Sequence, residues 1–118
     1  MSQALLSVAQ HTTADGVHVV ALSGDSDHTT ASAFRQALTP PDGSAPHTVA
    51  DFRDVTFMDS SGINILVAAN NTARSHGGSL RLAHTPTPVL DLLRIVGLDA
   101  ILPLYPTLED ALAPPAAA

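Results

Sequence analysis

The sequence contains no cysteine, no lysine and no tryptophan, and aromatic residues make up only 3% of it. Without cysteine there is no disulfide, no thiolate metal site and no cysteine nucleophile, which fits a reducing compartment. Because hydrophobic residues nevertheless reach 45%, the core must be built from Val, Leu, Ile and Ala. The length of 118 residues suits a single domain and leaves no room for a second.

Positive charge and long apolar runs are also scarce. Five Arg face eleven Asp and Glu, so the formal net charge is −6 and direct nucleic-acid binding is disfavoured. No run approaches the roughly 20 apolar residues of a membrane-spanning helix, and the N-terminus lacks the basic segment and cleavage site of a leader. We therefore expect a cytoplasmic protein with no membrane partner. The use of Arg alone, with abundant Ala, is typical of a GC-rich bacterial genome.

Strand-like and helix-like segments alternate along the chain, an order that favours an α/β layer over a bundle or a sandwich. The hydrophobic pattern predicts strands at 5–10, 17–23, 48–52 and 79–84, and a weaker one at 100–105 that contains Pro103. Helices are predicted at about 30–38, 61–76 and 87–96, with a short terminal helix after Thr107. We expect a mixed sheet of roughly four or five strands with helices packed mainly on one face. A surface loop at 39–46 and a flexible Ala/Pro tail at 114–118 complete the prediction.

Capping residues predict the ends of these helices. Thr87 is the expected N-cap of the third helix, Pro88 follows in its first turn, and Gly97 closes it. Thr107 and Asp110 form a capping box for the terminal helix. Apolar stripes should face the core, at Phe34 and Leu38 in the first helix and at Val89, Leu90, Leu93 and Val96 in the third.

The segment Asp59-Ser60-Ser61-Gly62 lies where a strand gives way to a helix, so its side chains and free N–H groups point outward at one edge of the sheet. In one interpretation Ser60 is an ordinary N-cap that accepts hydrogen bonds from the first turn. In the other, its hydroxyl is exposed and can carry a phosphate, which the positive end of the helix tolerates. A phosphoserine adds about −1.5 to −2 charges, so the site would act as a switch and not as a catalyst.

The stretch "VTFMDSSGINILVAA" resembles the signature of the STAS-domain anti-sigma factor antagonists. The likeness extends over nearly the whole chain, through "SGDSDHTTASAFRQAL" and "ADFRDVTFMDSSG" to "LRLAHTPTPVLDLLRIVGLDAILPLYPTLEDALA". This last segment ends in the T-x-E-x-A that is typical of the family. The resemblance implies a STAS domain over residues 1–113.

This resemblance implies a partner-switching regulator that is not an enzyme and needs no cofactor. Unmodified, such a protein binds an anti-sigma factor that is itself a serine kinase, and so frees a sigma factor for transcription. Phosphorylation by that kinase turns it off. Ser60 takes the position of the phosphorylated serine, and Ser61 is the nearest rival acceptor. The implied partner-binding residues are Asp27, Asp59, Ser60, Ser61 and Gly62, and a serine phosphatase is a further candidate partner.

Ser26 departs from the family pattern, because Leu, Ile or Val usually occupies this place in a Gly-acid-aliphatic-Asp turn. We expect the polar side chain to loosen the turn or to shift partner preference. The departure therefore concerns the role of Asp27 more than that of Ser60.

Two enzyme-like patterns are weaker. Gly24-Asp25-Ser26 resembles the nucleophile segment of a hydrolase family, but His28 is too close in sequence to turn onto Ser26, so a polar turn is favoured. Asp51 and Asp54 are expected in a solvated turn after a strand rather than as an acid/base pair.

Binding of a small ligand stays open. The six histidines lack the spacing of metal ligands, and His18, in an apolar strand, is a candidate for a hydrogen-bonded interior histidine. A STAS-like module that binds a nucleotide, a lipid or a scaffold without being phosphorylated is the remaining alternative.

Overall fold

The computed structural model describes residues 6–26, 29–39 and 47–112. Asp27, the loop at 40–46 and the expected tail lie outside the described residues. The elements in chain order are β1 (Leu6–Thr12), β2 (His18–Ser26), α1 (Ala31–Leu38), β3 (His47–Met58), α2 (Ser60–Ser75), β4 (Ser79–Ala83), α3 (Thr87–Ile95), the 3₁₀ helix η1 (Leu98–Ala100), β5 (Leu104–Tyr105) and α4 (Leu108–Leu112).

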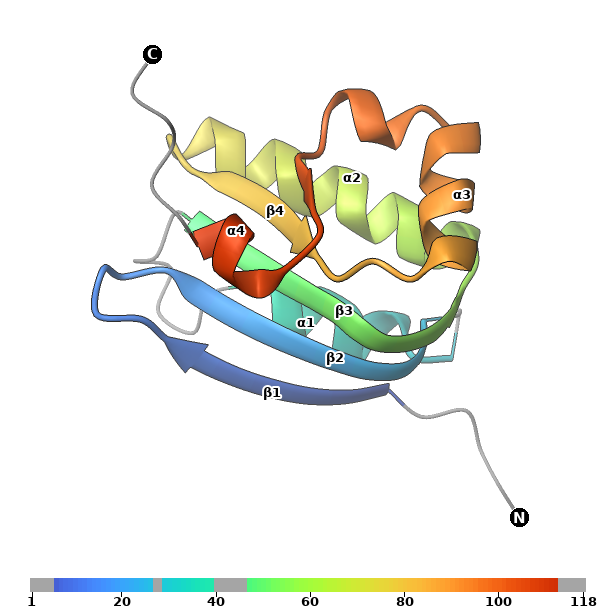
Figure 1. Cartoon of the computed structure of the whole chain (residues 1–118), viewed down its shortest axis with the longest axis horizontal. Helices are drawn as coiled ribbons and strands as arrows, with labels where there is room; N and C mark the ends of the chain where they lie inside the picture. Colours follow the sequence, from blue (N-terminus) through green and yellow to red (C-terminus); the bar gives the residue numbers. More distant parts are fainter. Residues whose placement is uncertain (1–5, 27–28, 40–46, 113–118) are drawn as a thin grey trace.

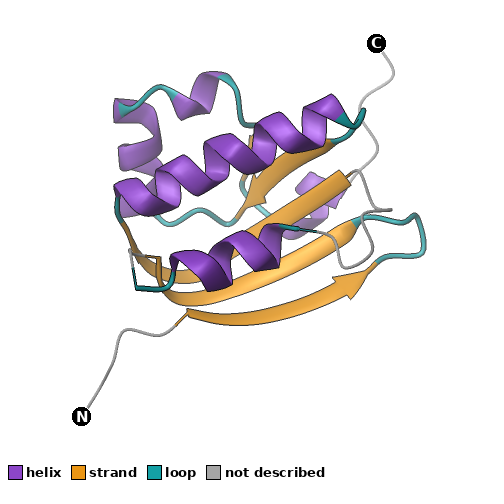
Figure 2. Ribbon diagram, turned by 180° about the vertical axis from the view of Figure 1, so that it is seen from behind, coloured by secondary structure: helices purple, strands orange, loops and turns teal. Residues whose placement is uncertain are grey.

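The strands form one sheet in the order β1-β2-β3-β4-β5. β1 runs antiparallel to β2, and the other neighbours are parallel. The expected mixed sheet is confirmed, with α1, α2 and α3 packed on one face and α4 on the other (Figure 1). Parallel strands end at the same edge of a sheet, so the carboxyl ends of β2, β3 and β4 meet the edge where α2 and α3 begin (Figures 1 and 2).

The main core lies between the sheet and α1, α2 and α3. Phe34 of α1 and Phe52 of β3 are both fully buried there, with ring centroids 6.1 Å apart and ring planes at 57°. The other buried members are aliphatic apart from Met58, as the composition predicted: Val20, Leu22, Ala37, Leu38, Ala50, Val55, Ile65, Leu66, Leu80, Leu82, Val89, Leu93, Leu98 and Leu102. The first helix buries Phe34 and Leu38 as expected.

A smaller cluster lies on the opposite face of the sheet, under α4. Val49 and Ala83 of the sheet contact Ala111, and the half-buried Val17 and Tyr105 pack around them. The Thr107 hydroxyl oxygen accepts a hydrogen bond from the Asp110 N–H at 3.0 Å, which confirms the part of the predicted capping box that Thr107 forms. Across the described ranges, none of the helices has both the length and the apolarity that crossing a lipid bilayer requires.

β3 is much longer than the predicted strand at 48–52. Its pairing with β2 continues to Met58, past register shifts at Ala21/Ser23 and Gly24/Asp25. Bulges of this kind rotate a strand locally, so Phe52 and Val55 both face the core although they are three residues apart. Asp51 and Asp54 therefore lie on the strand, and their expected place in a turn was wrong.

The C-terminal boundaries also differ from the prediction. Pro86, not Thr87, is the N-cap of α3, with φ −62° and ψ 151°. Gly97 turns the chain with φ 80°, as expected, and leaves Val96 49% exposed rather than in the apolar stripe. The last strand is shortened to two residues because η1 and Pro103 occupy its predicted start.

Candidate functional site

Asp59 caps the start of α2. Its backbone is extended, its N–H donates to the Ser26 carbonyl oxygen at 3.1 Å, and its Oδ1 accepts from the Ser61 N–H at 2.8 Å. The interpretation of Ser60 as the N-cap was therefore wrong. Asp and Ser are both favourable N-cap residues. Asp59 is the cap here because pairing with β2 keeps the backbone extended as far as Asp59, so the helix begins at Ser60.

Ser60 is the first helical residue and is exposed. Asp59, not Ser60, accepts the hydrogen bond from the Ser61 N–H, and no hydrogen bond within the described part of the chain uses the Ser60 hydroxyl. Ser61, the rival acceptor, is half-buried. Of the two hydroxyls, Ser60 is thus the more accessible to a second protein, and it lies beside the positive end of a 16-residue helix.

Gly62 lies in the first turn of α2 and is buried. A Cβ at this position would lie 2.6 Å from Ser26 Oγ and 2.7 Å from Met58 Cγ. Glycine therefore lets the helix start directly against the ends of β2 and β3. Because Gly62 is not exposed, any effect it has on a partner acts through the position of this turn.

Ser26, the departure from the family pattern, lies under the same turn. It pairs with Met58 in the β2–β3 register and is 2% exposed. Its Oγ is buried and has no hydrogen-bond partner in the structure. The side chain therefore lines the floor of the site rather than its surface, and it cannot be the accessible nucleophile of a hydrolase.

Asp25 ties three elements together at this edge. Its Oδ1 accepts a hydrogen bond from the Thr56 hydroxyl of β3 at 2.6 Å, and its carbonyl oxygen accepts from the Thr30 hydroxyl, just before α1, at 2.8 Å. The sequence alone did not reveal this link, because it depends on the register between β2 and β3. Asp27, two residues further on, lies outside the described residues.

Phe57 is a second feature that the sequence alone did not single out. It pairs with Asp25 in the register and is 49% exposed, whereas the following Met58 is buried. A residue on a strand before a helix is expected to face the core as often as solvent, so only the structure reveals this exposed ring.

His18 begins β2 and so lies at the end of the sheet away from this edge. His18 is buried as expected, with Nε2 2.8 Å from Gln10 Oε1. Burial, and then the nearby His11, lowers its pKa below the usual histidine value. Among the residues that the structure describes, no group of three or more His, Asp or Glu side chains is arranged to hold a metal ion.

The sequence and the fold are similar to those of known proteins. A family model described as "Mlab, STAS domain" matches residues 4–104. The anti-sigma F factor antagonist of Paenibacillus polymyxa is 31% identical over 99 residues, covering 82% of this chain and 85% of the relative. The crystal structure of an anti-sigma factor antagonist from Mycobacterium paratuberculosis superimposes with a TM-score of 0.81 at 34% identity, covering 92% of both chains.

A more distant likeness concerns the fold alone. The phosphorylated form of the Bacillus cell fate determinant SpoIIAA has a TM-score of 0.70 at 20% identity, covering 89% of this chain and 96% of that one.

Proposed function

This chain belongs to the STAS domain family, and from that premise we propose that it acts as an anti-sigma factor antagonist. The support is that relatives above 30% identity, aligned over most of both chains, carry this name. The proposed regulator is not an enzyme and works in the cytoplasm, where sigma factors act.

The proposed mechanism is partner switching at Ser60. The unphosphorylated protein binds an anti-sigma factor that is a serine kinase, and a sigma factor is released. Phosphorylation of Ser60 by that kinase ends the interaction, and a serine phosphatase restores it. One observation carries the choice of residue: Ser60 is exposed at the first position of α2, while Asp59 performs the capping.

A phosphate at this position is compatible with the fold. The N-terminus of α2 carries partial positive charge, so a dianion on Ser60 leaves the helix intact. The phosphate instead opposes binding of a partner, because its bulk occupies the edge over which the partner would dock. To reduce a partner from about 99% bound to 1%, it must weaken binding by about 5.5 kcal/mol.

The proposed contact surface is the edge around Asp59, Ser60 and Ser61. We include Asp27 because the family resemblance implies that it binds the partner. Gly62 is buried and contributes by holding the first turn in place. The net charge of −6 argues against direct contact with nucleic acid.

Two substitutions test the switch. Ser60→Ala should bind the anti-sigma factor as wild type does but resist inactivation by kinase and ATP. Ser60→Asp, whose charge is smaller than that of a phosphate, should bind weakly. Titration calorimetry measures both affinities, and intact-mass spectrometry after the kinase reaction should detect one added phosphate.

Ser61→Ala is the matched control, because it removes the neighbouring hydroxyl and should still accept a phosphate on Ser60. Equal affinities of wild type, Ser60→Ala and Ser60→Asp would refute the mechanism, as would phosphate found on Ser61 alone.

A second candidate is a STAS-type module that binds a ligand or scaffold without phosphorylation. This candidate is supported by the description of the matched family model, which names Mlab and not an anti-sigma factor antagonist. It predicts no phosphate on any serine after incubation with a cognate kinase.

A further inference from the structure

Phe57 is exposed in a protein that has few aromatic residues. The chain has three Phe and one Tyr. Phe34 and Phe52 are fully buried in the core and Tyr105 is half-buried, whereas Phe57 is 49% exposed. A half-exposed phenyl ring adds less to folding than a buried one, and it offers an apolar surface to a binding partner.

The position of Phe57 places its ring at the edge that carries Ser60. Phe57 pairs with Asp25 in the last rows of the β2–β3 ladder, and Met58 turns into the core, so Phe57 faces away from α1 and α2. Ser60 lies three positions further along the chain, and chain geometry limits the distance between their Cα atoms to about 11 Å. One partner surface can therefore cover both side chains.

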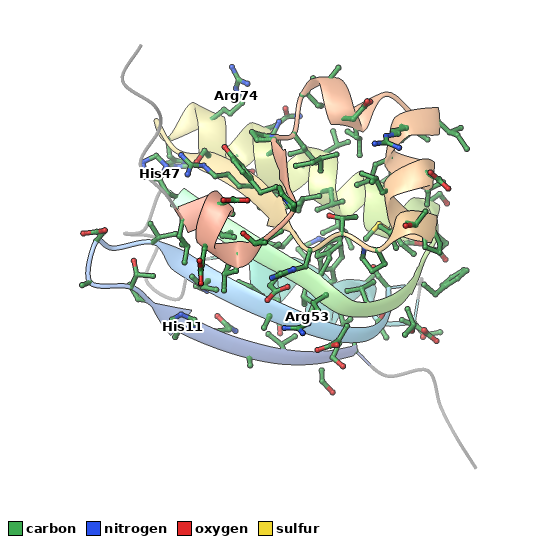
Figure 3. All side chains as sticks on the ribbon, in the orientation of Figure 1. His11, His47, Arg53 and Arg74 are labelled. Atoms are coloured by element: carbon green, nitrogen blue, oxygen red, sulfur yellow. The ribbon has the colours of Figure 1, made fainter. Side chains whose placement is uncertain are left out.

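Two acidic residues neighbour Phe57. Asp25 lies opposite Phe57 on β2, and Asp59 follows two residues later. The nearest cation in the sequence is Arg53, exposed on β3 four positions before Phe57, and no Arg, Lys or His occurs between Arg53 and Arg74. Arg74 is in the last turn of α2, and Figure 3 shows it at the end of the molecule away from the start of that helix.

We propose that Phe57 is the apolar anchor of the docking edge and that it inserts into a pocket on the anti-sigma factor that is bordered by Arg or Lys. This inference rests on the proposed function and names the chemistry of the partner's surface. The acidic border decides the occupant: a second copy of this chain would bring Asp25 and Asp59 against their own counterparts, whereas a cationic border complements them. Anchors of this type carry a large share of the binding energy of an interface.

The decisive experiment compares the wild type with Phe57→Ala in calorimetric titrations against the anti-sigma factor. Phe57→Ala should bind at least about 30-fold more weakly, the loss typical of a hot-spot side chain. Its thermal unfolding should match that of the wild type, because the ring is half exposed. Phe57→Leu, which keeps much of the apolar surface, should recover part of the affinity.

Ile101→Ala is the matched control, since Ile101 is 47% exposed and lies after η1. It should bind as wild type does. Equal affinity of Phe57→Ala and wild type, or an equal loss in Ile101→Ala, would overturn the anchor role. Affinity that does not fall as the salt concentration rises would overturn the cationic border.

Two further outcomes separate this inference from the proposed function. If the wild type binds no anti-sigma factor, the proposed function fails and the anchor fails with it. If Phe57→Ala instead converts a dimer of this chain into a monomer in sedimentation experiments, the occupant is a second copy and the inference is wrong.

Discussion

Gly62 shows how a single missing side chain fixes the geometry of the candidate site. The first turn of α2 rests on Ser26 and Met58, and the space between them leaves no room for a Cβ. Both neighbours are themselves buried, at 2% and 6% exposure, so neither can move into solvent to make room. The orientation of Ser60 therefore depends on a contact two residues away from it.

Gly62→Ala should destabilise the fold by about 1–2 kcal/mol, because the overlap outweighs the gain in helix propensity. Ser26→Ala in the same chain should recover part of the loss by removing the Oγ, which would lie 2.6 Å from the new Cβ. Urea unfolding of the single and double variants measures both effects.

Asn71→Ala, at an exposed position of α2, is the control and should gain a few tenths of a kcal/mol from propensity. Gly62→Ala with unchanged or higher stability would show that the floor of the site is not tightly packed.

At the scale of single elements, the sequence predicted the type and order of nearly every helix and strand, because apolar spacing and turn residues mark them. The predicted strand lengths were wrong where pairing with a strand distant in the sequence sets the end of a strand. β3 continues through the polar segment after Phe52 because β2 offers hydrogen bonds up to Ser26, and no local pattern reveals that partner. The last strand has only two residues, which pair with Leu82 and Ala83 of β4.

The candidate site was predictable to a similar extent. The Asp59–Gly62 segment was evident from its position between a strand and a helix, and the structure brings its residues to one edge. The identity of the cap, the buried place of Ser26 and the exposed ring of Phe57 were not evident, since each follows from the register of β2 against β3. The roles of the segment in partner binding stay predictions.

α4 depends on two side chains from the neighbourhood of β4. His84 Nε2 accepts a hydrogen bond from the Leu108 N–H at 3.1 Å, and Arg81 Nη1 donates to the Ala111 carbonyl oxygen at 2.8 Å. A helix of five residues has little stability of its own, so these bonds at its two ends hold it against the sheet.

His84→Ala should loosen α4 locally by about 1 kcal/mol, since it removes the acceptor for the first helical N–H. Hydrogen exchange read by mass spectrometry should show roughly fivefold faster exchange over residues 108–112. His47→Ala is the control, because that exposed side chain is bonded to Ser79 and not to α4. Equal exchange in the two variants would show that His84 does not hold the helix.

For the molecule as a whole, His18 couples stability to pH. Its pKa in the folded protein is lowered by burial and by His11, whereas the unfolded chain has the ordinary value of 6.5. Between these two values the unfolded state binds more protons than the folded state. Stability is therefore highest above the unfolded pKa and falls as the pH drops below it.

The melting temperature should accordingly fall as the pH is lowered from 7.5 to 5.5. In His18→Asn the melting temperature should depend less steeply on pH over the same range. His76→Asn, at an exposed position, should keep the wild-type slope. Calorimetric melting of the three proteins in buffers of matched ionic strength provides the measurement. A wild-type slope in His18→Asn would mean that other groups set the pH response.

The strand order β1-β2-β3-β4-β5 repeats the order of the strands along the chain, and this bears on how the protein is made. Each strand that leaves the ribosome finds its partner in the strand synthesised just before it, so no later segment must insert between strands that have already paired. The sheet can grow from one side while translation continues, and α4 covers its second face after β5 has been made.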